Sequence, residues 1–115
     1  MVCVKTLLRR IKEHMEKFIL ADSNYWPDCA REILNFVRGM RKARCLKKSK
    51  RYISSFINEL QETKDGLREL CECFEQFKYT RFSSGNRIII DGIRAYSRLR
   101  KAYDELEYII SFLLN

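Results

Sequence analysis

Apolar residues recur every three or four positions along most of this chain, which is the spacing of an amphipathic helix. In the first segment they fall at Val4, Leu8, Ile11, Met15 and Phe18. Charged residues fill most of the positions between them, so one face of the segment is apolar and the other faces are polar. The pattern predicts a first helix from Val2 to Ala21, followed by a polar break that contains the only proline, Pro27.

A second helix is predicted from about Pro27 to about Lys47. Proline suits the first turn of a helix because its missing N–H would have no partner there. The expected inner face is Ala30, Ile33, Val37 and Met40, with Leu34 and Phe36 beside it. We expect Trp26, next to the proline, to pin the first connection onto the core.

The third apolar stripe keeps its helical step without a slip. Its members are Ile53, Phe56, Leu60, Thr63, Leu67, Leu70, Phe74 and Phe77. Asp65-Gly66 would normally suggest a turn, but the phase of the stripe continues through it. With Ser49 as a cap, we expect one helix that ends at about Tyr79 and is roughly 45 Å long at 1.5 Å per residue.

The segment from Lys78 to Arg87 is expected to be a loop, because Ser83-Ser84-Gly85-Asn86 is a strong stop signal. The run Ile88–Ile90 could be a short strand, but no partner strand is evident, so we interpret it as the start of a fourth helix. Its apolar stripe is Ile89, Ile93, Tyr96, Leu99, Tyr103, Leu106, Ile110 and Leu113, and Tyr108 is also read as core. The prediction is an all-α, antiparallel four-helix bundle with long third and fourth helices, forming one domain over residues 1–115.

Composition narrows the class of protein. With 115 residues, 46% hydrophobic and 33% charged, the chain suits one globular domain that is neither disordered nor membrane-spanning. The N-terminus lacks the apolar block of a secretory signal, which predicts an intracellular protein of the cytoplasm, nucleoid or nucleus. An odd number of cysteines, five, and a single histidine argue for reduced thiols and against a metal site, and no cofactor is expected.

Positive charge is concentrated in one stretch, Arg38–Arg51, which we call the basic stretch. Its cations are Arg38, Arg41, Lys42, Arg44, Lys47, Lys48, Lys50 and Arg51, and it contains no acid. The formal net charge of the whole chain is also +8, so the remaining residues cancel. Such a density of cations attracts phosphates, which predicts a non-catalytic protein that binds the backbone of nucleic acid. The alternative is a protein-interaction module that meets an acidic protein, or a homodimer in which the acidic third helix meets the basic stretch of a second copy.

A remote alternative comes from Arg9 and His14 in the first helix. The spacing Arg-x-x-x-x-His resembles the Arg-x(4–6)-His signature of HEPN domains, which are helical bundles that often act as metal-independent ribonucleases. In that family the motif lies late in the chain, whereas here it lies in the first helix. The resemblance implies a ribonuclease that uses Arg9 and His14 at a dimer cleft, while a partly solvated histidine is the structural alternative.

Overall fold

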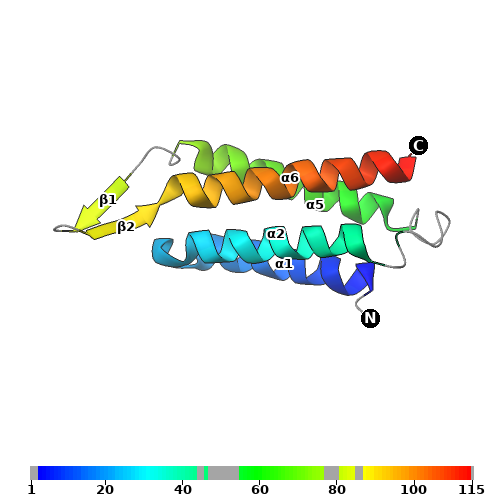
Figure 1. Cartoon of the computed structure of the whole chain (residues 1–115), viewed down its shortest axis with the longest axis horizontal. Helices are drawn as coiled ribbons and strands as arrows, with labels where there is room; N and C mark the ends of the chain where they lie inside the picture. The colour runs from blue at the N-terminus through cyan, green and yellow to red at the C-terminus, as the bar shows by residue number, and fades with distance from the viewer. Residues whose placement is uncertain (1–2, 44–45, 47–54, 77–80, 85–86, 115) are drawn as a thin grey trace.

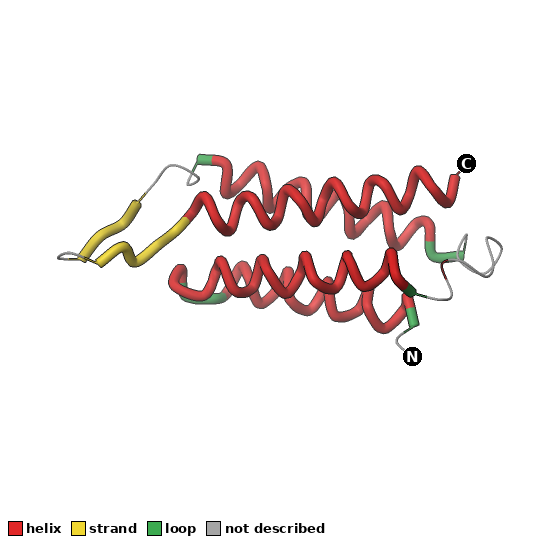
Figure 2. Tube along the Cα trace, viewed as in Figure 1, coloured by secondary structure: helices red, strands yellow, loops and turns green. Residues whose placement is uncertain are grey.

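The computed structural model describes residues 3–43, 46, 55–76, 81–84 and 87–114. Its helices are α1 (Val4–Leu20), the short 3-10 helix η1 (Ser23–Tyr25), α2 (Trp26–Lys42), α5 (Ile57–Glu75) and α6 (Gly92–Leu114). Two strands, β1 (Arg81–Ser84) and β2 (Arg87–Asp91), precede α6 (Figures 1 and 2). The prediction of a bundle built from four helices is confirmed for the described part of the chain.

The helices pack as two hairpins laid against each other. Figure 1 shows α1 and α2 running in opposite directions, and α5 and α6 likewise, with both termini at the same end of the bundle. Contacts are extensive between α1 and α2, between α2 and α6, and between α6 and α5, but sparse between α1 and α5. The bundle is therefore closed on three sides and loosely closed on the fourth.

One hydrophobic cluster holds the four helices together. The residues predicted for the inner faces of α1 and α2 are buried, except that Met15 and Phe36 are only partly buried. In α5 the predicted stripe is buried from Leu60 to Leu70, and Thr63 satisfies its hydroxyl by donating to the Glu59 carbonyl at 2.7 Å. No buried side-chain nitrogen or oxygen among the described residues lacks a hydrogen-bond partner.

The helix boundaries differ from the predicted ones. α2 ends at Lys42, before the expected Lys47, and Ala43 has extended backbone angles. α5 begins at Ile57 and ends at Glu75, so it is shorter than the 45 Å expected; the proposed cap, Ser49, lies outside the described residues. Its continuity through Gly66 is confirmed.

The expected helical start at Ile88–Ile90 is wrong, because these residues belong to β2. The partner strand that the sequence analysis did not find is β1, which pairs with β2 in an antiparallel hairpin. The register sets Arg81 opposite Asp91 and Ser84 opposite Arg87, with an irregularity after Phe82. Two residues separate the strands, and Gly-Asn at such a position is a known hairpin signal. The structure is thus a helical bundle with a short hairpin before its last helix.

The start of α6 also has a different inner face from the predicted one. Ile93, expected in the core, is 50% exposed, whereas Ala95 and Ala102 are buried. Small residues on the inner face let α6 approach α2 closely. A hydrogen bond also joins the two helices, since Arg98 of α6 donates from Nη1 to the carbonyl oxygen of Pro27 in α2 at 2.7 Å. The prediction for Trp26 is confirmed: its ring packs on Phe18 and Phe74, and its Nε1 donates to the carbonyl of Ala21 at 3.2 Å.

Candidate nucleic-acid interface

Three members of the basic stretch lie together on the last turns of α2. Arg38, Arg41 and Lys42 are three and four residues apart, so they share one face of the helix, and all three are exposed. The other five predicted contact residues lie outside the described residues: Arg44, Lys47, Lys48, Lys50 and Arg51. In the described part of the chain, the site consists of these three α2 side chains and the α6 side chains beside them.

A carboxylate of α6 lies between the two arginines. Arg41 Nη1 donates to Glu105 Oε2 at 2.9 Å, and Arg38 Nε lies 3.9 Å from Glu105 Oε1. The hydrogen bond to Glu105 raises the pKa of Arg41 above its ordinary value. Glu105 is the more buried partner, with a side chain 20% exposed against 44% for Arg41. The carboxylate therefore fixes the direction of the guanidinium group while leaving much of it open to solvent.

The positive charge is only partly matched within the chain. Two arginines share the single carboxylate of Glu105, which leaves one positive charge over, and Lys42 has no ion pair among the described residues. By contrast, several other cations pair one to one with an acid of the same helix, as Arg31 does with Asp28 at 3.3 Å. The end of α2 is thus a place of excess positive charge.

Aromatic side chains of α6 lie next to these cations. The Arg41 guanidinium carbon lies 4.3 Å from the centroid of the Tyr108 ring, a cation–π contact. Tyr108 is 55% exposed and Phe112 is 48% exposed, so the reading of Tyr108 as core is wrong. Together with Arg41, Leu46 and Ile109, these rings line a shallow cavity of about 180 Å³. Planar groups are therefore available to a ligand beside the cations.

Sequence reasoning did not single out the α6 side of this site. Glu105, Tyr108 and Phe112 follow each other at spacings of three and four, so they share one face of α6. That spacing was a usable signal, but only the structure shows that this face lies beside Arg41, which is 64 residues from Glu105 in sequence.

Arg9 and His14 of the remote alternative point in different directions. Five residues of helix turn the chain so that their side chains lie about 140° apart around α1. Arg9 pairs with Glu13 at 3.9 Å. The His14 ring lies edge-on to Phe36, with centroids 5.0 Å apart, and its Nδ1 lies 3.0 Å from the carbonyl oxygen of Arg10. Within one chain the two side chains do not converge on a common cleft.

The thiols and carboxylates in the described part of the chain form no metal-binding site. There, no group of three or more histidine, cysteine, aspartate or glutamate side chains is placed to hold a metal ion. Among the described residues, Cys3, Cys29, Cys71 and Cys73 form no disulfide. Burial raises the pKa of Cys71 to about 11, so this thiol is protonated at neutral pH.

None of the described helices is both long and apolar enough to cross a membrane.

Comparisons with protein-family models, with curated proteins and with solved structures gave no match.

Proposed function

We propose that this protein binds nucleic acid without catalysing a reaction, and that the basic stretch contacts the phosphates. The observation that carries the proposal is the exposed cation group at the end of α2: Arg38, Arg41 and Lys42 outnumber their one carboxylate, Glu105. By sequence, five further cations follow within the next nine residues, again without an acid. The proposal also implies a location in the cytoplasm, nucleoid or nucleus, where nucleic acid is found.

The chemistry of the group suits phosphate. An arginine can grip a phosphate through two parallel hydrogen bonds, and each neutralised phosphate releases counterions into solution. Because Arg41 is already oriented by Glu105 and Tyr108, less side-chain freedom is lost when it binds a ligand. Contacts of this kind position a nucleic acid but do not read its sequence, so we expect little sequence specificity.

The aromatic neighbours favour single strands over duplexes. Unpaired bases stack on exposed aromatic rings and on arginine planes, and this stacking tolerates any base. Tyr108 and Phe112 offer such rings within the same site as Arg41. A duplex keeps its bases stacked on each other, so it would use only the phosphate contacts.

The proposal is tested by fluorescence anisotropy with labelled single-stranded DNA and RNA of mixed sequence. Replacing Lys47, Lys48 and Lys50 together with glutamine should weaken binding and make it less salt-dependent, by about 0.7 in the log–log slope for each lost phosphate contact. Replacing Tyr108 with serine should weaken single-strand binding with little change in the salt slope, because stacking is not ionic.

A matched control uses cations outside the basic stretch. The triple replacement of Lys5, Lys17 and Lys64 with glutamine makes the same change in net charge on α1 and α5. This variant should bind almost as tightly as the wild type. If both triple variants lose affinity equally, binding follows net charge alone, and the basic stretch is not the contact surface.

A second candidate is association through protein contacts, with an acidic partner or a second copy. The observation that favours a second copy is the acidic surface of α5, where every carboxylate is exposed: Glu59, Glu62, Asp65, Glu69, Glu72 and Glu75. This surface could meet the basic stretch of another copy. Light scattering at low and high salt separates the two candidates, since a charge-paired homodimer should dissociate as salt rises and a monomeric nucleic-acid binder should not change mass.

A further inference from the structure

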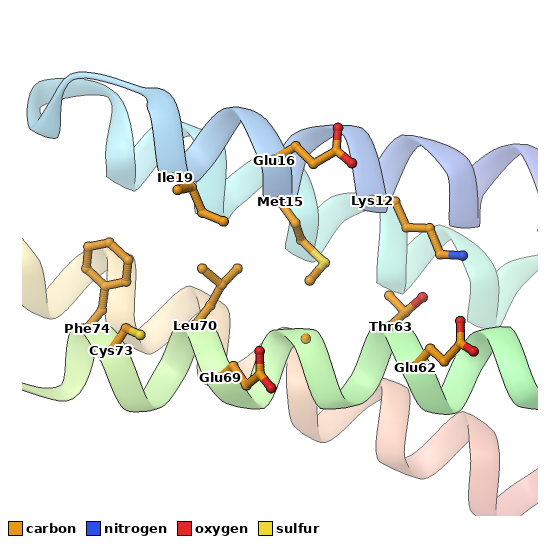
Figure 3. A pocket seen from close by; sticks show the side chains of 11 residues that line it. Lys12, Met15, Glu16, Ile19, Glu62, Thr63, Glu69, Leu70, Cys73 and Phe74 are labelled. Atoms are coloured by element: carbon orange, nitrogen blue, oxygen red, sulfur yellow. The ribbon is translucent and has the colours of Figure 1, made fainter.

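The sparsely packed side of the bundle, between α1 and α5, holds a groove. It has a volume of about 560 Å³, which lies in the range of ligand sites in proteins. Figure 3 shows Met15 and Ile19 of α1 pointing toward Leu70 and Phe74 of α5 across it. Ile19 is 67% exposed although it lines this apolar floor. The two helices thus present apolar faces that neither fully covers for the other.

The floor is shaped by Gly66. A Cβ atom at this position would lie 2.7 Å from Met15 Cε, so the absent side chain leaves room for the methionine. Methionine is unbranched and flexible, and proteins that accept varied apolar partners use it for that reason. On α5 the lining residues run from Glu62 to Phe74, which corresponds to a length of about 18 Å. An elongated floor between two helices suits a rod-like occupant better than a compact small molecule.

The rim of the groove is acidic, in a chain whose net charge is +8. Glu16 on α1 and Glu62 and Glu69 on α5 are exposed lining residues, and within the described part of the chain they have no ion pair. Among the described residues, Lys12 is the one cation that lines the groove, and it lies 3.8 Å from Glu59, so its charge is already met. The rim therefore carries uncompensated negative charge around an apolar floor.

From this combination we propose that the groove binds a cationic amphipathic helix of a partner protein. Leucine-like side chains of the partner would fill the space between Met15, Ile19 and Leu70, and its lysines or arginines would meet the rim carboxylates. Helices dock in apolar grooves in this way through side chains spaced three and four residues apart. The acidic rim repels nucleic acid and anionic lipid, so this surface is distinct in chemistry from the basic stretch.

The test uses a synthetic peptide of about four helical turns, with leucine on one face and lysine on the others. The protein carries ¹³C-labelled methionine methyl groups, and binding is followed by NMR. The Met15 methyl lies in the groove, while Met40 is fully buried in the core and serves as an internal reference. We expect saturable, micromolar binding that shifts the Met15 signal and leaves the Met40 signal in place.

Two pairs of variants locate the binding. Ile19→Ser should weaken it about tenfold, because one large apolar contact is lost. Leu20→Ser should not weaken it, since Leu20 is also an exposed apolar residue, at 86%, but does not line the groove. Likewise, glutamine at Glu62 and Glu69 should weaken binding several-fold at low salt. Glutamine at Glu72 and Glu107, which lie outside the groove, should have no such effect.

Several outcomes would overturn the proposal. One is an unshifted Met15 methyl at millimolar peptide, and another is equal binding of a peptide in which glutamate replaces lysine. A Met15 shift that depends on protein concentration alone would mean that a second copy already fills the groove. Loss of peptide binding at the groove can be told apart from loss of nucleic-acid binding. The variant with glutamine at Lys47, Lys48 and Lys50 should bind the peptide as tightly as the wild type does.

Discussion

Two glycines inside helices provide a sharp test of the packing. Gly39 lies in α2 and Gly66 in α5, and a glycine inside a helix costs about 1 kcal/mol relative to alanine. A Cβ at position 39 would meet Leu7 Cδ2 at 3.6 Å and Cδ1 at 3.7 Å, which is ordinary contact. A Cβ at position 66 would meet Met15 Cε at 2.7 Å, so there the methionine has to move.

These distances predict different outcomes for the same substitution. Gly39→Ala should stabilise the protein by about 1 kcal/mol, which corresponds to a rise of about 4 °C in Tm for a domain of this size. Gly66→Ala gains the same helix propensity but forces Met15 from its rotamer, at a cost of about 0.5–1.5 kcal/mol. Its net effect should therefore be close to zero.

The assay is thermal and urea unfolding followed by circular dichroism, with a double-mutant cycle. In a Met15→Ala background the clashing atom is gone, so Gly66→Ala should recover the full gain of about 1 kcal/mol. Gly39→Ala should give the same gain in either background. The reasoning is refuted if Gly39→Ala destabilises the protein, or if Met15→Ala leaves the effect of Gly66→Ala unchanged.

Three further predictions concern the site and its chemistry. Glu105→Gln should tighten single-strand binding about two- to threefold and steepen its salt dependence, because two arginines lose their competing carboxylate. Weaker binding would mean that orienting Arg41 matters more than freeing its charge. At pH 8 a thiol reagent should label the exposed Cys73 quickly and Cys71 slowly, since Cys71 is buried and has a pKa of about 11. Equal labelling rates of the two thiols, measured by mass spectrometry, would contradict the burial of Cys71. RNA incubated with the protein should stay intact, and cleavage that disappears in His14→Ala would replace the binding proposal with a ribonuclease.

Helical periodicity predicted most of the bundle correctly. In α5 the apolar stripe keeps its phase across Asp65-Gly66, and the helix is indeed continuous, because burial of one face outweighs the local cost of a single glycine. The inner faces of α1 and α2 were likewise predictable. Each helix buries one apolar stripe against the rest of the bundle, and the spacing of apolar residues every three or four positions indicates which face that is.

The rest could not be predicted from helical periodicity. The strand at Ile88–Ile90 pairs with β1 across only two residues, but β1 is a mostly polar segment without a strand pattern of its own, so the pairing was not evident in the sequence. The exposure of Ile93 and Tyr108 depends on which side of α6 meets α2, and several stripes on one helix are compatible with the sequence. The ion pairs of Glu105 with Arg38 and Arg41 join α2 to α6, and no local pattern indicates them.

The central claim, that the basic stretch serves to bind nucleic acid, is tested most directly by the affinity of the wild-type protein for a labelled single strand at two salt concentrations. With three or more phosphates neutralised, raising the salt from about 50 to about 200 mM should weaken binding at least about tenfold. A duplex of the same length should bind more weakly than the single strand at both concentrations. No binding at the lower salt, or binding that the salt leaves unchanged, would contradict the claim.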